Sequence, residues 1–278
     1  MSKVARVLAK KMLTSSEFEM ASALIKSDGK VPFQTKALWN VFPYSYYAYG
    51  MFHSCRLAAA LGIKRVSSIE FGVAGGNGLL AMEAHARVIE ELVGVSIDVY
   101  GFDTGAGLTP PVDYRDMPYR FKKGNYRMDV EKLKGRLERA QLVLGDVRKT
   151  ARTFLKDYQP APIAFVSFDM DYYSSTMHAF QMFAAGNKDD FFLPRIFMYF
   201  DDVVGNEISC YNDFVGELAA INDFNAGSRD VKIAQNRVFR NYNLNFPWYH
   251  QSYVMHRFAH RLYDKYISKA SARSLALK

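Results

Sequence analysis

Residues 163–176 read IAFVSFDMDYYSST, an apolar run followed by Asp169 and Asp171. A second segment of the same kind, residues 192–202 (FLPRIFMYFDD), closes with a pair of aspartates. Short apolar runs bounded by polar residues indicate buried strands. Carboxylates at strand ends repel one another and lose hydration, a cost that a divalent cation would remove because it prefers oxygen ligands. The two segments therefore predict strands of one sheet and a metal site at its carboxyl edge.

Strand-like and helix-like segments alternate along the rest of the chain. Strands are expected at residues 65–71, 96–102, 141–144, 163–168 and 196–200, with weaker patterns at 231–233 and 253–258. Helices are expected at residues 78–92, 130–139, 149–158, 174–185 and 211–222. Such alternation predicts an α/β fold, with a mostly parallel seven-stranded sheet flanked by helices. Ligands of such sheets bind beyond the carboxyl ends of the strands, where the acidic segments fall.

Charge and length suggest three parts of this 278-residue chain. Residues 1–62 are expected to be a helical N-terminal extension that packs on the core, residues 63–260 the main α/β domain, and residues 261–278 a basic C-terminal helix. Residues 1–14 carry four Lys or Arg and no acid, and the last 28 residues carry six against Asp264, so the net charge of +8 lies at the ends. The basic ends could contact an anionic surface, a nucleic acid or a partner, or could be solvated helix faces.

A glycine-rich turn follows the first expected strand and reads EFGVAGGNG over residues 70–78. Glycines let the backbone turn tightly and approach a ligand, and the following helix offers free amides. The spacing is not GxGxxG, and no Lys-Ser/Thr follows as in a P-loop. The turn is therefore a candidate ligand site, with a tight strand-to-helix turn that binds nothing as the alternative.

Two further acids follow the second and third expected strands. Asp103 stands where an acidic side chain commonly holds ribose hydroxyls in doubly wound folds. Asp146 could accept from an adenine amino group, although either residue could instead be a turn residue or a helix cap. Together with Glu70, these acids suit a ligand with amino, ribose and adenine groups, as S-adenosylmethionine has. NAD fits less well, because the glycine spacing does not suit a pyrophosphate.

At these motifs the chain resembles the macrocin O-methyltransferase family, over roughly residues 44–204. The resemblance rests on Glu70-Phe-Gly72-Val73, Tyr100-Gly-Phe-Asp103-Thr, Gly107-Leu108, Gly124-Asn-Tyr126, Gly145-Asp146, Asp169-Met-Asp171-Tyr-Tyr-Ser-Ser-Thr176 and Asp201-Asp202. Members are magnesium-dependent enzymes that use S-adenosylmethionine to methylate sugar hydroxyls. The resemblance implies a Rossmann-like class I methyltransferase fold and an O-methyltransferase acting on a sugar or a glycosylated or other small-molecule acceptor.

The resemblance also implies roles for single residues. The metal ligands would be Asp169, Asp201 and Asp202, and Asp171 would be the general base, although it could instead cap the helix that starts near Ser174. The cofactor-binding residues would be Glu70, Gly72, Val73, Gly75, Gly76, Asn77, Asp103 and Asp146. Glycines stand at positions 75 and 78, where family members often carry basic and hydroxyl residues, so backbone amides or Asn77 would hold the methionine carboxylate. Residues 185–194 look lengthened and are expected to border the pocket, which leaves the acceptor open.

The remaining signals place the chain only broadly. Cys55 and Cys210 form neither a disulfide framework nor a zinc spacing, and no apolar run reaches the roughly 20 residues that span a bilayer, so a cytoplasmic protein is expected. His178 could reach the pocket from the helix after Asp171, but it is interpreted as a packed or surface residue. The aromatic stretch 42–52 suits core packing or self-association into a homo-oligomer. Two alternatives stay open: a methyltransferase-like protein that binds RNA or a membrane surface through its basic ends, and an O-methyltransferase of phenolic or lipid-linked acceptors.

Overall fold

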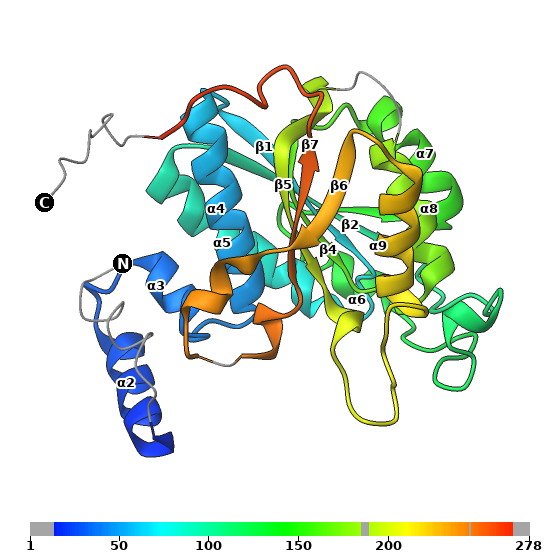
Figure 1. Ribbon diagram of the computed structural model, residues 1–278, viewed down its shortest axis with the longest axis horizontal. Coiled ribbons are helices and arrows are strands. Elements are labelled where there is room, and N and C mark those ends of the chain that lie inside the picture. Colours follow the sequence, from blue (N-terminus) through cyan, green and yellow to red (C-terminus); the bar gives the residue numbers. More distant parts are fainter. Residues whose placement is uncertain (1–13, 185–188, 245, 269–278) are drawn as a thin grey trace, which may run out of the picture.

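A seven-stranded sheet forms the centre of the molecule (Figure 1). The computed structural model describes residues 14–184, 189–244 and 246–268. The strand order is β3-β2-β1-β4-β5-β7-β6. The strands are β1 (Arg65–Phe71), β2 (Ser96–Asp103), β3 (Gln141–Leu144), β4 (Ile163–Phe168), β5 (Phe192–Phe200), β6 (Val231–Gln235) and β7 (Ser252–Arg257). The α/β fold with a mostly parallel sheet is confirmed, and the sheet is mixed because β7 pairs antiparallel with both β5 and β6.

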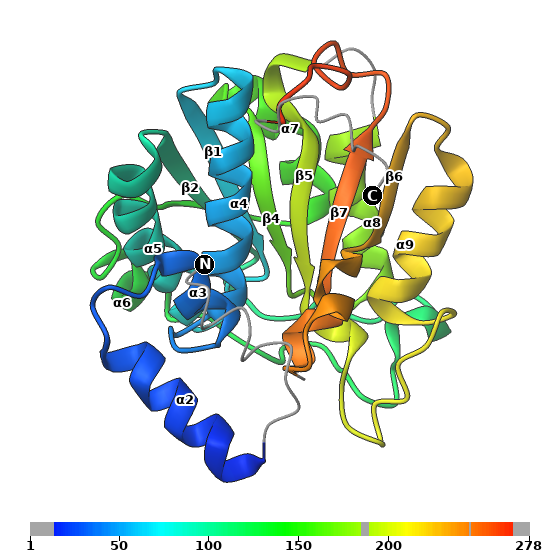
Figure 2. The same ribbon diagram turned by 60° about the vertical axis from the view of Figure 1, so that its left-hand side comes forward.

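Helices cover both faces of this sheet (Figure 2). The helices of the described residues are α2 (Ser15–Ser27), α3 (Phe33–Leu38), α4 (Ser45–Leu61), α5 (Asn77–Val93), α6 (Val130–Lys134), α7 (Val147–Tyr158), α8 (Tyr173–Ala184) and α9 (Gly216–Gly227), and α2 lies away from the sheet (Figures 1 and 2). On one face α4 packs beside α5 and against β4 and β5, while α7, α8 and α9 pack side by side on the other. Every residue of β4 is buried, as expected for a central strand with both faces covered.

A row of phenylalanine rings crosses the sheet at its carboxyl edge. Phe71 pairs in register with Phe102 and Phe168, and Phe168 pairs with Phe200. The ring centroids of Phe102 and Phe71 lie 4.6 Å apart, those of Phe71 and Phe168 5.2 Å, and those of Phe168 and Phe200 4.7 Å. Cross-strand aromatic pairs of this kind stabilise a sheet beyond the apolar area they bury. The row therefore fixes the backbone positions from which the next residues of each strand project.

The two ends of the chain were expected to form distinct parts. The helical N-terminal extension over residues 1–62, expected to pack on the core, is not confirmed as a unit because residues 1–13 lie outside the described part. Within the remainder, α4 packs against β4 and β5. The expected basic helix does not begin at residue 261: residues 261–264 form turns and 265–268 are irregular, while 269–278 lie outside the described residues. The Leu262 amide donates to His260 Nδ1, a local side-chain bond that competes with helix formation.

Two other expected elements are shifted. The helix expected over residues 211–222 begins only at Gly216, as α9, because the Asn212 side chain accepts from the Phe214 amide and holds a turn there. Of the segment 185–194, the described residues 189–194 do not line the cavity. Phe192 pairs with Ile163 at the start of β4, which places the described part of this segment at the amino edge of the sheet, opposite the acidic clusters.

Candidate functional site

A cavity of about 630 Å³ opens at the carboxyl edge of the sheet. Gly72, Asp103 and Asp146 line it at the ends of β1, β2 and β3. All four aspartates of the acidic segments line the same cavity: Asp169, Asp171, Asp201 and Asp202. The other five expected cofactor residues are not among its lining: Glu70, Val73, Gly75, Gly76 and Asn77. The structure thus joins the glycine-rich turn and the acidic segments in one site.

Gly72 lets the ends of β1 and β4 meet at the floor of the cavity. Its φ is +85°, and a Cβ there would lie 1.7 Å from the carbonyl oxygen of Asp169. The Asp169 amide in turn donates to the Phe71 carbonyl at 2.9 Å. Only glycine satisfies both the left-handed conformation and this backbone approach.

The carboxylate of Asp103 holds the glycine-rich turn in place. Its Oδ2 accepts from the amides of Val73 at 3.0 Å and Ala74 at 2.9 Å, and its Oδ1 accepts from the Gly105 amide at 2.7 Å. The turn role considered for this residue is therefore present. Because each carboxylate oxygen can accept more than one hydrogen bond, Asp103 keeps capacity for a ligand in the cavity it lines.

Asp146 is the N-cap of α7, as its position before the helix suggested. Its side chain accepts from the Arg148 amide at 2.9 Å and from Arg148 Nε at 2.8 Å. The hydrogen bond from the Arg148 guanidinium holds the pKa of Asp146 below its ordinary value. Asp146 and Arg148 both line the cavity, so this ion pair forms part of its wall.

Glu70 lies beneath the start of α5 rather than in the cavity. Its Oε1 accepts from Tyr47 Oη at 2.8 Å, and a Cβ at Gly78 would lie 1.9 Å from the same oxygen. Its Oε2 is buried and has no hydrogen-bond partner in the part of the chain that the structure describes. Burial raises the pKa of Glu70 to about 8, against the lowering effect of the Tyr47 hydrogen bond. A buried carboxylate oxygen without a hydrogen-bond donor lowers the stability of the folded protein.

The acidic segments form a cluster of mutually repelling carboxylates. Asp169 is open to the cavity but surrounded by protein, and burial together with Asp201 and Asp202 raises its pKa well above the ordinary value. Asp202 is buried, and its two oxygens accept from the Asp171 amide at 2.9 Å and from Tyr211 Oη at 2.8 Å. Burial and Asp201 raise the pKa of Asp202 to about 6.

Asp171 does not continue the strand. Its φ is +60°, so the alternation that would put it on one face with Asp169 ends at Phe168, and the hydrogen bond to Asp202 holds its backbone instead. It nevertheless lines the same cavity. Burial and Asp202 raise the pKa of Asp171 to about 8. The amide of Ser174 donates to Asp116 Oδ1, so Asp116 occupies the capping role considered for Asp171.

The donor atoms of this cluster suit a metal ion, but their arrangement in the structure does not form a metal-binding group. Oxygen donors and repelling carboxylates suit a hard divalent cation. Within the described residues, however, no three His, Cys, Asp or Glu side chains converge as a metal-binding group. Hydrogen bonds occupy both oxygens of Asp202, and Asp201 Oδ1 accepts from Tyr199 Oη at 2.8 Å. Asp201 and Asp202 are thus already held by protein donors.

The sequence predicted a long loop after the second strand but assigned it no role in the site, although it builds one wall of the cavity. This cavity loop, residues 104–129, joins β2 to α6 and places Leu108, Arg120 and Tyr126 against the cavity. Its length at the carboxyl edge was the available signal, because long ordered loops beside a sheet edge commonly carry binding residues. His178 was also underestimated: it is half-buried and lines the cavity, and its Nδ1 has no partner among the described residues.

Several solved structures with a similar overall arrangement are described as methyltransferases. The calicheamicin methyltransferase CalS11 is 18% identical, covers 92% of this chain and 96% of its own, and has a TM-score of 0.46. The O-methyltransferase NovP is 14% identical over 75% of this chain and 80% of its own, with a TM-score of 0.47. MycE, solved with Mg, SAH and mycinamycin VI, is 13% identical over 93% of this chain and 66% of its own, with a TM-score of 0.43.

These likenesses are too weak to carry a functional argument. No protein-family model and no curated protein matches the sequence. The function must therefore rest on the residues of the cavity. Among the described residues, no helix is long and apolar enough to cross a membrane.

Proposed function

We propose that the protein is an S-adenosylmethionine-dependent O-methyltransferase. The observation that carries the proposal is the single cavity that joins Gly72, Asp103 and Asp146 to the acidic cluster. Asp103 and Asp146 would bind the ribose and adenine groups, and the backbone amides of Gly75 and Asn77 in the glycine-rich turn would bind the methionine end. The amides of Val73 and Gly76 already donate to Asp103 Oδ2 and to the Val73 carbonyl, respectively. A methyl donor at one end of a cavity and carboxylates at the other is the arrangement that methyl transfer to a hydroxyl needs.

We further propose that Asp169, Asp201 and Asp202 hold Mg²⁺ or another divalent cation. When bound, such a cation lowers the pKa of a hydroxyl that it contacts. Burial and then repulsion between the aspartates raise the pKa of Asp169 and Asp202, and a bound cation would relieve the repulsion. The hydrogen bonds from Tyr199 and Tyr211 would then orient Asp201 and Asp202.

Asp171 is the proposed general base. It would accept the proton of the acceptor hydroxyl as the oxygen bonds to the methyl carbon and the carbon–sulfur bond breaks, which leaves S-adenosylhomocysteine. Burial and Asp202 raise the pKa of Asp171 to about 8. A general base is most effective when its pKa lies near the pH at which the enzyme works. Its fixed backbone, bonded to Asp202, would hold it beside the cluster.

The proposed acceptor is a sugar hydroxyl, free or in a glycosylated small molecule, because polar side chains line much of the cavity. A phenolic or lipid-linked acceptor is the alternative within the enzyme class. Binding of RNA or a membrane surface through the basic ends depends largely on residues 1–13 and 269–278, which lie outside the described residues. We propose a cytoplasmic enzyme, with the oligomeric state to be measured.

Calorimetric titration of S-adenosylmethionine, with and without Mg²⁺, tests the proposal most directly. We expect saturable binding in both conditions, and S-adenosylhomocysteine formation only when Mg²⁺ and an acceptor from a glycan and nucleotide-sugar panel are present. Failure to bind S-adenosylmethionine would overturn the proposal. Turnover unchanged by a chelator would overturn its metal part alone.

A further inference from the structure

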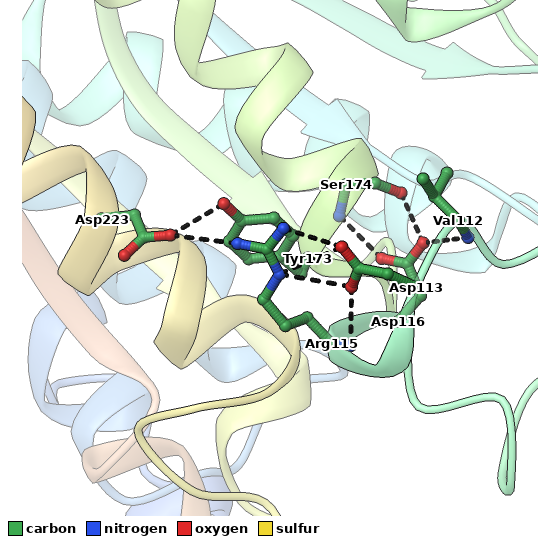
Figure 3. A network of polar contacts seen from close by, with 7 residues as sticks. All are labelled: Val112, Asp113, Arg115, Asp116, Tyr173, Ser174 and Asp223. Carbon is green, nitrogen blue, oxygen red and sulfur yellow. Dashed lines mark hydrogen bonds and ion pairs between the residues drawn. The ribbon is translucent and has the colours of Figure 1, made fainter.

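Asp116 is a fully buried carboxylate that lines no part of the cavity. It ends the short helix η1 (Tyr114–Asp116) within the cavity loop. Its Oδ1 accepts from the Ser174 amide at 2.8 Å, and its Oδ2 accepts from Ser174 Oγ at 2.7 Å and from the Val112 amide at 2.8 Å (Figure 3). A buried charge with three such bonds is costly to disturb, because loss of any one leaves a desolvated group unpaired.

These bonds join the cavity loop to the segment that carries the proposed base. Ser174 lies in the first turn of α8, three residues after Asp171. The first amides of a helix are usually satisfied by a residue directly before it, but here the acceptor comes from 58 residues earlier in the chain. The start of α8 therefore depends on where the cavity loop lies.

A small apolar cluster supports the same junction. Met117 and Phe121 of the cavity loop bury their side chains against Tyr172, the residue next to Asp171. Tyr172 Oη donates to the Thr109 carbonyl at 3.2 Å. Met117 follows Asp116 directly, so a shift of η1 would move polar and apolar contacts to the Asp171 segment together.

Partly exposed polar contacts between Arg115, Tyr173 and their partners lie on the outer side of this junction. The Arg115 guanidinium lies 3.8 Å from the ring centroid of Tyr173 and pairs with Asp113 at 2.7 Å. Tyr173 Oη donates to Asp223 Oδ2 on α9 at 2.8 Å (Figure 3). Because these groups are partly exposed, solvent screens them and each pair contributes little alone. Asp113 therefore offers a matched control for Asp116, on the same turn and with the same charge.

We propose that Asp116 is a positioning residue that couples the cavity loop to Asp171. It holds the first turn of α8 and thereby sets where the Asp171 carboxylate stands relative to an acceptor bound against the loop. The proposal rests on the proposed methyl transfer and adds a determinant of acceptor use that touches neither acceptor nor cofactor.

The test compares Asp116→Asn with Asp113→Asn in the full-length protein. In Asp116→Asn, the new side-chain NH₂ group must point at one of the N–H or O–H donors that Asp116 accepts from, so at least one hydrogen bond is lost. We therefore expect kcat/KM for the acceptor to fall about tenfold or more. The Kd for S-adenosylmethionine should stay within about twofold, since its proposed ligands lie on other elements. Asp113→Asn should leave both values near wild type.

Hydrogen exchange measured by mass spectrometry provides a readout that does not need turnover. In Asp116→Asn, peptides covering the cavity loop and residues 169–176 should exchange faster together, while Asp113→Asn should not show this. Faster exchange in the loop alone, or unchanged acceptor kinetics, would overturn the coupling. If Asp116→Asn does not fold, Asp116→Glu, which keeps the charge but displaces the oxygens, serves in its place with the same outcomes. Absence of methyl transfer by wild type would count against the proposed function, and the exchange result would still decide the coupling.

Discussion

Single carboxylates in this site serve the backbone as well as the cavity. Asp103 accepts three backbone amides around the glycine-rich turn. Asp202 accepts from the Asp171 amide, and its own amide donates to Glu217 Oε2 at 3.0 Å. A substitution at either residue would therefore move the backbone as well as remove a charge. Asp169 is the better choice for separating the two effects, because it is open to the cavity.

Asp169→Asn and Asp171→Asn are expected to fail in different ways. Asp169→Asn should lose Mg²⁺-stimulated methyl transfer but keep its affinity for S-adenosylmethionine. Asp171→Asn should lower kcat about 10²–10⁴-fold, the usual contribution of a general base, with a smaller change in the Mg²⁺ dependence. Asp98→Asn, which removes an ion pair with Arg65 away from the cavity, is the matched control. Full activity in Asp169→Asn would refute the metal role, and preserved turnover in Asp171→Asn the base role.

The buried side chain of Glu70 should make the stability of the protein depend on pH. Burial raises its pKa in the folded protein to about 8, from an ordinary value of 4.5, so the folded state binds the extra proton between these two pH values. Its contribution is fully present below about pH 4.5 and is lost as the pH rises towards 8. Glu70→Gln, which mimics the protonated form, should make the free energy of unfolding less dependent on pH in this window. Urea denaturation of both proteins at pH 5, 6.5 and 8 checks this. An equal change of the unfolding free energy with pH in the two proteins would contradict it.

At the scale of elements, the carboxyl ends of four neighbouring strands carry both the aromatic row and the site. Phe71, Phe102, Phe168 and Phe200 stand across these strands in register. Each of them is followed directly by a residue that lines the cavity: Gly72, Asp103, Asp169 and Asp201, respectively. The packed rings therefore act as a rigid base for the polar residues above them.

Phe168→Ala tests this base. Phe168 is fully buried between Phe71 and Phe200, so its removal should lower the free energy of unfolding by about 3–5 kcal/mol. It should also weaken S-adenosylmethionine binding, because Asp169 and Gly72 abut directly above it. Phe258→Ala, at a ring that is 46% exposed, is the control and should change stability little. The measurements are denaturant unfolding and calorimetric titration, and a loss below about 1 kcal/mol would contradict the role of the row.

At the scale of the whole molecule, the cavity draws its walls from distant parts of the chain. The cavity loop meets α8 through Asp116, and Tyr119 Oη of the same loop donates to the Ser209 carbonyl at 3.0 Å. Ligand binding should therefore stabilise the entire fold. At 100 times its Kd, S-adenosylmethionine should add about 2.7 kcal/mol to the free energy of unfolding. Thermal unfolding with S-adenosylmethionine, and with NAD as the control nucleotide, measures this, and an equal rise with NAD would contradict the proposed specificity.

Much of the sheet could be predicted because strands are encoded locally. Apolar runs bounded by turns placed β1, β3 and β4 at the residues where the structure has them, and β2 within one residue. The position of polar groups at strand ends then followed from the rule that parallel strands end at one edge. Local patterns were less informative where the chain is irregular: β7 lies reversed between β5 and β6, and the described residues 189–194 lie at the opposite edge of the sheet from the cavity.

The order of apolar and polar residues thus sufficed to bring Gly72, Asp103, Asp146 and the acidic segments to one edge of a sheet. Their individual partners required the folded chain. Asp103 meets the glycine-rich turn, Asp202 meets the Asp171 amide, and Asp116 meets Ser174 across 58 residues. The physical reason is that periodicity encodes which face of an element is buried. It does not encode which distant backbone group a buried side chain will meet, because that depends on how all the elements pack.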